Sequence, residues 1–543
     1  MSMVFRAAGV RRASPGWSVG LLLFALLSMP ISLAGGILRS GHPGEPDSLD
    51  PHNSVAAPAL IVHNDLFESL LTLDARGQPV AGAAERYSVS ADGRSYTFTL
   101  RPGLQYSDGH PIVAEDFVWS IRRLADPATA STGLAAWIDL LENGRAILAR
   151  EKSVDSLGVE APDARTVRIR LATPAPYFPS IVAFPVFAPL PRHVIEKYGR
   201  AWTRPENMVS NGPFMLESWT PGQPVRVRRN PKFHAAQSVR LDGVEYHSVS
   251  DQNTGLRLFQ SGRLDTVTNF PPDKLELLRR DFPRELRIAP STGLTAYVFN
   301  HRLAKFRDRR VREALSMAVD RRILTTRIVR SGDRPAFAIV TPALSAFSRR
   351  HVDGVADAER AKRARALLRQ AGYDESRPLD IELLYHTSEE HKKVAVAVAS
   401  MWQAAGVRVT LRNAERQVVE AATRQGDFEV VRAAWFSPYS DPTGFFAFLK
   451  RGSPSNGGAY FNASFEALLE RAGNTVDATA RQRLLEDAEA LVVADHAIIP
   501  LYHIVSRRLV AARVIGWRDD NLTALRPARW LDLRAPAPGV SER

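Results

Sequence analysis

Residues 379–436 alternate strand-like and helix-like patterns with short connections, and this run constrains the fold more than any other part of the chain. Apolar residues recur at every second position in the strand-like parts and at helical spacing in the parts between them, and Gly406 and Gly426 end the two helical parts. The predicted elements are strands at 379–385, 407–411 and 428–435 and helices at 391–405 and 415–425. Because connections of this length pair consecutive strands in parallel, we expect a doubly wound α/β domain here.

The same pattern indicates where such a domain would bind a ligand. Parallel sheets bind ligands beyond the carboxyl ends of their strands. The first predicted strand runs into residues 385–391, and the third predicted strand ends in residues 432–437. We therefore expect these two segments to line a ligand-binding cleft.

Composition limits the class of protein further. The chain has 543 residues, of which 45% are apolar, and no cysteine, so it can form two or three domains with real cores and without disulfide bonds. The formal net charge of +13 is compatible with a nucleic-acid partner. However, the 71 basic residues are interspersed with 58 acidic ones and no recognition motif accompanies them, so we expect no nucleic-acid partner.

Residues 1–34 have the layout of a secretory signal peptide. Three arginines precede an apolar run whose uninterrupted part, residues 21–27, is far shorter than the roughly 20 residues that span a bilayer. Small residues favour cleavage after Ala34, while the Arg11-Arg12 pair leaves a twin-arginine signal as the weaker alternative. Since a lipid anchor needs a cysteine, we expect a periplasmic protein, secreted across the inner membrane, that is not a lipoprotein.

Residues 101–127 combine the end of a strand, two tight turns and the start of a helix. Within this segment the pattern SDG-x-P-x-x-A-x-DF-x-x-S resembles the signature of the bacterial extracellular solute-binding proteins of family 5, which serve importers of dipeptides, oligopeptides or nickel. The resemblance is strongest to the oligopeptide-binding type. Further family-like segments follow in the family's order at residues 45–52, 65–74, 210–219, 306–321 and 383–393.

The resemblance implies an α/β, two-lobed periplasmic binding protein fold of type II with an extra inserted domain. Lobe I would combine residues 35–66, 209–292 and 506–543. The inserted domain would span residues 67–208, and lobe II residues 293–505. Two lobes joined by a hinge can close over a ligand and shield it from water.

The resemblance also implies a function. The protein would be the periplasmic substrate-binding component of an ABC importer that takes a peptide or peptide-like solute, and its partners would be a permease and ATPase subunits in the inner membrane. We expect a monomer without enzymatic activity and without a cofactor. A nickel complex, haem or an oligosaccharide remain alternative ligands, and a secreted enzyme acting on peptides is the alternative from a different class.

No metal site is expected from the sequence. His386 and His391 are five residues apart, so a helix would not place both on one face. The pattern G-x-S-x-G, which can carry a nucleophilic serine, occurs only at residues 16–20, inside the predicted signal peptide.

Relatives of the oligopeptide-binding type hold an extended peptide as an added strand and bind its main chain rather than its side chains. Carried over to this chain, the main-chain partners would be Ala57, Ala434 and Phe436. Small residues at two of these positions permit a close approach of the peptide backbone. Ordinary core packing is the alternative explanation for the two alanines.

Charged and aromatic ligand contacts are carried over in the same way. Arg432 corresponds to an arginine that meets the carboxylate of a peptide of one length, and His391 to a histidine that serves a longer one. The alternative for Arg432 is a salt bridge to Glu429 or Asp441. Trp435 corresponds to a tryptophan that lines the pocket, and core packing is its alternative.

One position departs from the family pattern. Relatives that bind oligopeptides place an aspartate where this chain has Pro438, and that aspartate pairs with the peptide's α-ammonium group. Proline carries no charge and donates no backbone hydrogen bond. Asp441 is a nearby substitute, and Arg416 replaces a pocket aromatic. This departure makes a ligand with a modified or absent amino group an alternative to a plain peptide.

Overall fold

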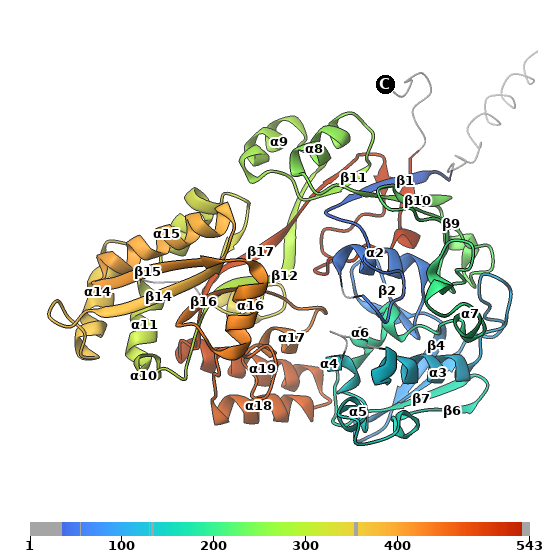
Figure 1. Ribbon diagram of the computed structural model, residues 1–543, viewed down its shortest axis with the longest axis horizontal. Coiled ribbons are helices and arrows are strands. Elements are labelled where there is room, and N and C mark those ends of the chain that lie inside the picture. The colour runs from blue at the N-terminus through green and yellow to red at the C-terminus, as the bar shows by residue number, and fades with distance from the viewer. Residues whose placement is uncertain (1–34, 55, 130, 132–134, 352–356, 535–543) are drawn as a thin grey trace, which may run out of the picture.

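The computed structural model describes residues 35–54, 56–129, 131, 135–351 and 357–534. The predicted signal peptide lies outside these residues. Among the described helices, none combines the length and the apolar character that crossing a membrane requires. Figure 1 shows two bodies joined by long strands, which fits the expected two-lobed architecture.

One sheet of eleven strands extends through both bodies of the described chain. Its order runs β15 (Val407–Ala414), β14 (Leu379–His386), β16 (Val430–Phe436), β12 (Leu286–Phe299), β17 (Ile498–Val510), β11 (Thr266–Thr268), β1 (Ile37–His42), β10 (Gly243–Ser248), β9 (Val225–Arg229) and β8 (Phe214–Ser218). The short β13 (Arg334–Pro335) pairs with β17 outside this path. We call the side with β1 and β8–β11 the first body, and the side with β14–β16 the second body.

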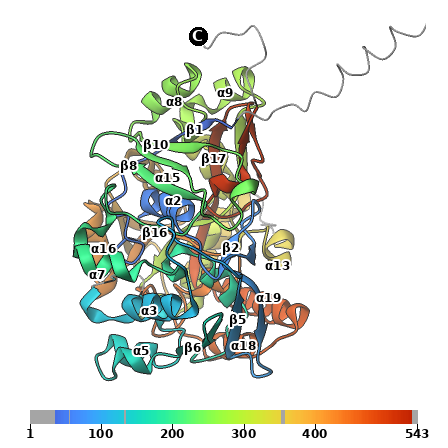
Figure 2. The ribbon, with the colours of Figure 1, turned by 90° about the vertical axis from the view of Figure 1, so that its right-hand side faces the viewer.

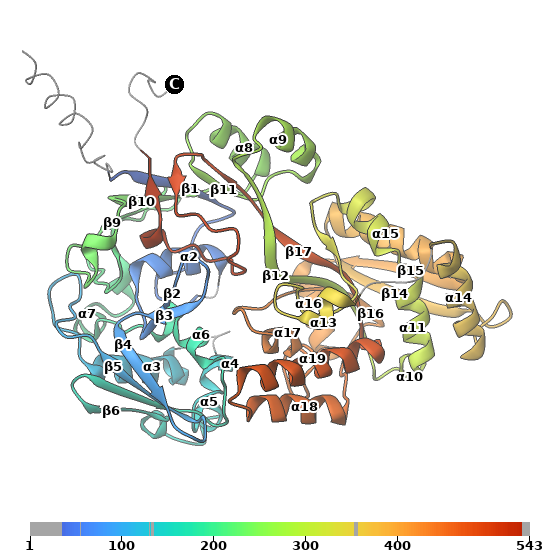
Figure 3. The same ribbon diagram turned by 180° about the vertical axis from the view of Figure 1, so that it is seen from behind.

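The strands β12 and β17 connect the two bodies. They have 14 and 13 residues and pair antiparallel over almost their whole length, from Leu286 opposite Leu509 to Val298 opposite Ile498. Figure 3 shows both strands crossing from one body to the other. The ladder shifts register between Pro290 and Gly293, and such an irregularity bends a strand. The predicted lobe boundaries fall inside these two strands, and the division into lobes stays a prediction.

The second body confirms the predicted α/β pattern. β14 pairs in parallel with both β15 and β16, and α15 (Glu389–Ala404) and α16 (Arg416–Gln425) connect them. Gly406 and Gly426 follow these helices with φ of 92° and 78°, a left-handed conformation that favours glycine. The other helices of this body are α10 (Ala304–Arg307), α11 (Arg309–Ala318), α12 (Arg321–Ile323), α13 (Ala346–Arg350), α14 (Asp357–Gln370), α17 (Thr443–Phe446), α18 (Ala463–Gly473) and α19 (Ala478–Ala494).

Each face of the sheet in the second body carries its own core. Val430 packs with Tyr297 on one face, and the next residue, Val431, packs with Phe445 on the other. Successive side chains of a strand point to opposite faces, so one strand serves both cores. Packing on both faces therefore holds the amino end of β16, at Val430 and Val431, whereas its carboxyl half is only partly covered.

The first body is assembled from segments that are far apart in the sequence. Its core combines residues from the chain's beginning, such as Leu38, with Phe214 and with Leu531 near the end. The additional helices and strands are α2 (Ala57–Leu66), α8 (Gln252–Gln260), α9 (Leu275–Asp281), β18 (Val514–Ile515) and β19 (Asp532–Leu533). The buried pair Arg529–Glu68 ties the last segment to the first.

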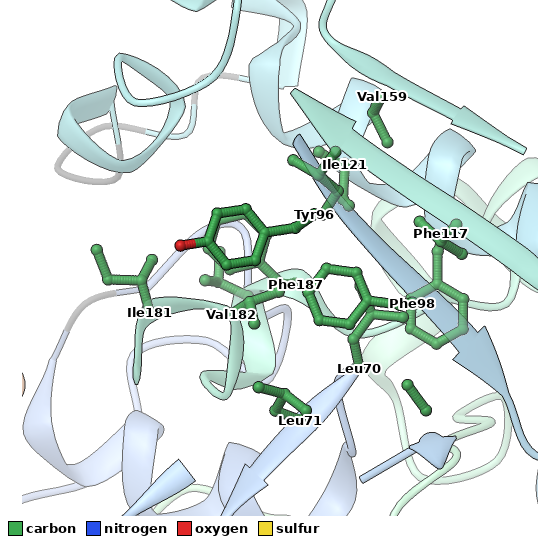
Figure 4. Packing of buried hydrophobic residues seen from close by; sticks show 14 of the residues in the cluster. Leu70, Leu71, Tyr96, Phe98, Phe117, Ile121, Val159, Ile181, Val182 and Phe187 are labelled. Atoms are coloured by element: carbon green, nitrogen blue, oxygen red, sulfur yellow. The ribbon is translucent and has the colours of Figure 1, made fainter. Parts of the chain in front are cut away.

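The inserted part has a separate sheet and core. Its elements are β2 (Leu71–Leu73), β3 (Pro79–Ala81), the sheet β4 (Ala84–Val89), β5 (Ser95–Leu100), β7 (Thr166–Arg170) and β6 (Val159–Asp163), and the helices α3 (Ala114–Ala125), α4 (Ala135–Ile138), α5 (Gly144–Leu148), α6 (Phe178–Val182) and α7 (Arg192–Tyr198). Figure 4 shows Tyr96 and Phe98 of β5 packed among Phe117 and Ile121 of α3 and Phe187. The family-like segment at residues 101–127 thus joins a core strand to a core helix.

A buried polar cluster joins the first body to the inserted part. Arg123 of α3 donates to Asp50 at 2.7 Å and to the Nδ1 of His52 at 2.7 Å, while the Nε2–H of His52 donates to the carbonyl of Val186 at 3.1 Å. An arginine can only donate and a carbonyl can only accept, so this arrangement requires a neutral His52. Burial, followed by the charge of Arg123, lowers the pKa of His52 to about 3.

We expect His52 to make folding sensitive to mild acid. The unfolded chain takes up a proton at His52 below about pH 6.5, whereas the folded protein does so only near pH 3. Stability is therefore lost as the pH falls through this window, by up to ~1.4 kcal/mol per pH unit for one histidine. Between pH 7 and 5, denaturant unfolding should show that the free energy of unfolding of His52→Gln falls less than that of the wild type. If the free energy of unfolding falls equally with pH in both proteins, His52 is not a buried neutral histidine.

Candidate functional site

One edge of β16 is free over most of its length. On one side β12 pairs with β16 from Gly293 opposite Phe436 to Phe299 opposite Val430. On the other side β14 reaches only Val430 and Val431, and no other strand of the described residues pairs there. The carboxyl half of β16 therefore presents an open strand edge.

The hydrogen-bond pattern between β12 and β16 determines which main-chain groups of β16 face this open edge. The Asn300 N–H donates to the Glu429 carbonyl at 2.9 Å, and the Ser437 N–H donates to the Thr292 carbonyl at 3.1 Å. In β16 the odd-numbered residues therefore turn their main-chain groups toward β12. Since antiparallel bonding alternates along a strand, Ala434 and Phe436 turn theirs outward. Both residues are exposed, Phe436 at 57%. This edge has the geometry that an added peptide strand requires.

Next to this edge, Arg432 and two histidines form a cationic cluster. Arg432 lies opposite Tyr297 in the ladder and close enough to both histidines to lower their pKa. The His391 ring stands perpendicular to that of His386 at 4.0 Å, and His391 Nδ1–H donates to the His386 carbonyl at 3.2 Å. Burial, then the charge of Arg432, then His386 lower the pKa of His391 to about 4. At neutral pH the cluster thus carries the Arg432 charge and neutral rings.

The salt bridge considered for Arg432 is not formed. Glu429 pairs instead with Lys305 at 2.6 Å, and Asp441 pairs with Arg481. The Arg432 Nε is buried and has no hydrogen-bond partner among the described residues. Partial burial of a guanidinium without a carboxylate partner lowers the stability of the protein, and an anionic ligand would offset this loss.

Trp435 is packed and also lines a cavity. Its Nε1–H donates to the Gly444 carbonyl at 2.7 Å, and its ring contacts that of Phe448 at 5.6 Å. The ring remains partly exposed and lines a cavity of about 90 Å³ together with Leu294 and Ala434. Core packing therefore holds the indole in place, and its contact with a ligand stays a prediction.

The loop after β16 offers no free carboxylate in place of the lost aspartate. Pro438 is exposed. Both oxygens of Asp441 accept from Arg481, at 2.7 and 2.9 Å, and the Thr443 N–H also donates to Asp441 at 3.0 Å. The negative charge of Asp441 is thus neutralised within the protein.

No sequence pattern pointed to Arg481 or to its surroundings. The Arg481 guanidinium also lies over the ring of Tyr177 at 6.0 Å, and Tyr177 stacks on Tyr439 at 5.2 Å with a 4° angle between the rings. Tyr177 precedes α6 of the inserted part, whereas the other residues belong to the second body. The pair Asp441–Arg481 therefore lies where these two parts of the molecule meet.

Ala57 lies on the first body, at the start of a helix rather than in a strand. It is the exposed first residue of α2, and the carbonyl of Ala56 accepts from the Leu60 N–H at 3.0 Å. Amide groups in the first turn have no partner within their own helix. Ala57 can therefore offer an N–H to a ligand from the body opposite β16, and that contact stays a prediction.

The described residues form two bodies joined by crossing strands, with a free strand edge and an arginine that has no carboxylate partner among them, and these features define a two-lobed ligand-binding protein. Residues 78–457 match the description of the bacterial extracellular solute-binding proteins, family 5 Middle. The chain belongs to this family. The relatives named in the next paragraph are binding proteins rather than enzymes.

Similar proteins are matched over nearly their full length. The probable deoxycholate-binding periplasmic protein YgiS of Escherichia coli strain K12 is 38% identical, covering 89% of this chain and 91% of the relative. The periplasmic oligopeptide-binding protein OppA of Salmonella typhimurium strain LT2 is 36% identical, covering 88% and 89%. The unliganded open form of the periplasmic murein tripeptide-binding protein MppA has a TM-score of 0.81 and 32% identity, covering 92% and 97%.

Proposed function

We propose that this protein is the periplasmic substrate-binding component of an ABC importer and that it captures a peptide or peptide-like solute between its lobes. It then delivers the solute to a permease with ATPase subunits in the inner membrane and performs no chemistry itself. The observation that carries this proposal is the free edge of β16 beside Arg432, which has no carboxylate partner among the described residues. Relatives named for oligopeptides and for a murein tripeptide support it.

In this proposal the ligand lies along β16 as an added strand. Ala434 and Phe436 bond its main chain, and Ala57 donates to it from the first body. Arg432, assisted by His391, holds its carboxylate through charge-assisted bonds. Trp435 borders the ligand's side chains, and Pro438 leaves the amino end without an ionic partner.

Ligand capture works through a shift between two arrangements of the lobes. We assign residues 35–66, 209–292 and 506–543 to lobe I, 67–208 to the inserted domain and 293–505 to lobe II. A ligand that contacts both lobes does so only when they are closed, so binding favours the closed arrangement. The permease recognises that arrangement.

A second candidate ligand is an acidic amphipathic molecule without an amino group. Deoxycholate has one carboxylate and no amine, and the 38% identical relative is named for it. The observation that favours this candidate is the missing ammonium partner, because Pro438 has no charge and Asp441 is neutralised by Arg481. The same Arg432 would hold the carboxylate of either ligand.

Native mass spectrometry of the protein isolated from its own periplasm tests the proposal. We expect a mature chain that starts at Gly35 and carries a bound peptide or another organic acid. The ligand can be extracted and identified by its mass. An intact Met1 in the cytosol would contradict secretion. A nickel complex, haem or a neutral oligosaccharide in the extract would contradict the ligand class.

Binding without turnover should be visible in solution. At ligand concentrations of several hundred to a thousand times the dissociation constant, we expect the free energy of unfolding to rise by about 3 to 4 kcal/mol. The peptide should be recovered unchanged by mass spectrometry after prolonged incubation. Turnover that a single substitution in the cleft abolishes would support the enzyme alternative instead.

A further inference from the structure

Two histidines and an aspartate converge on the surface of the inserted part, away from β16. The Asp108 Oδ2 accepts from His110 Nδ1–H at 2.8 Å and from His193 Nε2–H at 2.8 Å. The two imidazole rings stack at 4.1 Å. One ligand atom from each of the three residues lies within 4.8 Å of the others.

The backbone fixes this arrangement from two directions. Asp108 lies in a turn that the Gly109 N–H closes on the Tyr106 carbonyl at 2.9 Å, and the Tyr106 N–H donates to the His110 carbonyl at 2.8 Å. The His110 N–H also donates to Asp108 Oδ1 at 3.0 Å, which leaves Oδ2 for the two rings. Two of the three side chains therefore come from one closed turn.

The third side chain is held against this turn by a buried tyrosine. The Tyr106 hydroxyl donates to the Leu190 carbonyl at 3.1 Å, just before α7, which carries His193. The Tyr106 ring meets the edge of the His193 ring at 5.9 Å. Tyr106 itself is only 1% exposed. The convergence of the three side chains is thus built on the protein core, and Figure 2 shows α7 beside α3 on this side of the molecule.

The chemistry of the three side chains selects a class of metal ion. Two imidazole nitrogens and one carboxylate oxygen suit Zn²⁺, Cu²⁺ and Ni²⁺, whereas Ca²⁺ and Mg²⁺ prefer oxygen ligands alone. The side chains of Asp108, His110 and His193 are 27%, 60% and 37% exposed, so water can complete the coordination. Metal–ligand distances of about 2.0 to 2.2 Å place the ligand atoms of a tetrahedral site about 3.3 to 3.6 Å apart, so each side chain has to move by less than about 1 Å to admit the ion.

We propose that Asp108, His110 and His193 form a binding site for a divalent transition metal of the zinc type. The ion would take the place of the two ring protons that now bond the carboxylate, each neutral ring would carry its proton on the other nitrogen, and the ion would join the turn before α3 to α7. The sequence alone predicted no metal site, because His193 lies 85 residues from Asp108. The proposal is independent of the ligand proposed for the cleft.

Protons should compete with the metal at this site. A metal binds imidazole only in its deprotonated form, so affinity should fall as the pH falls. Asp116 of α3 is close enough to His193 for their charges to interact, and its carboxylate favours a cation there. The nearby Arg192 is bonded to Glu196 at 2.7 Å.

Calorimetric titration of ZnCl₂ into the mature, tag-free protein at pH 7.5 tests the proposal. We expect one zinc ion per protein, with affinity that falls at pH 6. His110→Gln and His193→Gln should each weaken binding by at least about tenfold, since even loss of groups that only support metal ligands has effects of that size. His247→Gln and His391→Gln, which alter histidines outside the cluster, are the matched controls. Co²⁺ in place of zinc should give a visible absorption band that both cluster variants lose.

Three results would overturn the proposal. The first is a wild-type protein that takes up no zinc at millimolar concentration. The second is full affinity in both cluster variants, and the third is a loss of affinity in His391→Gln equal to that in His193→Gln. The exposed histidines can be replaced without disturbing a core, and circular dichroism of each variant verifies its fold.

Discussion

Arg432→Ala should weaken the binding of an acidic ligand by about one to two orders of magnitude. A hydrogen bond to a charged group contributes about 1.5 to 3 kcal/mol, which corresponds to that range of affinity. The effect is expected because the guanidinium has no carboxylate partner among the described residues and is available to the ligand. Isothermal calorimetry with a peptide of fixed sequence, and with deoxycholate, would measure it.

Modifying the two ends of the peptide in turn distinguishes the loss of the carboxylate contact from a general loss of binding. Amidation of the carboxyl end should reduce affinity for the wild type strongly and for Arg432→Ala little, while acetylation of the amino end should matter far less in both. Arg408→Ala, on the edge strand β15 of the same sheet, is the control, because that side chain is 66% exposed and pairs with Asp380. If acetylation alone abolishes binding and amidation has no effect, the proposed orientation of the ligand is wrong.

Arg481→Met should lower the free energy of unfolding by about 3 to 5 kcal/mol, because it leaves the carboxylate of Asp441 without its partner in a largely buried site. The two side chains are only 11% and 14% exposed and share two hydrogen bonds. Denaturant unfolding of Arg481→Met, Asp441→Asn and the double variant would measure the coupling. We expect the double variant to be more stable than the sum of the single losses predicts.

Arg481→Met also tests why the amino end of the ligand lacks an ionic partner in the protein. Without Arg481, Asp441 is free to meet an ammonium group, so Arg481→Met should prefer a free peptide over its acetylated form more than the wild type does. Additive losses of stability in the double variant would show that the pair is not coupled. An unchanged preference would show that Asp441 cannot reach the ligand.

Local patterns were enough to predict the part of the second body that contains β14, β15 and β16. Strand periodicity and the glycines at Gly406 and Gly426 lie within a few residues of the elements that they determine, and β14, β15 and β16 appear close to the expected ranges. Their parallel pairing follows from the length of the connections. For the same reason the sequence located the segments that carry Arg432 and His391.

Features that depend on distant pairing could not be predicted in this way. β12 and β17 are long strands of different parts of the chain, and only their pairing shows that one sheet continues through both bodies. Asp441 and Arg481 are 40 residues apart, and no local pattern selects this partner over Arg432. Ala57 was carried over from the family resemblance as a main-chain partner, and only the structure shows that it lies in the first turn of α2, where its free main-chain group is an N–H donor.

The position of β17 has a consequence for how the chain is made. β17 is the last long strand in the sequence, yet it lies between β12 and β11 near the middle of the sheet. A chain that emerges from its amino end cannot complete this sheet until residues 498–510 are present, so the strands on the two sides of β17 stay separate until the end of synthesis. Slow folding follows from such distant pairing. A truncation that removes β17 would leave β11 and β12 with bare edges prone to aggregation.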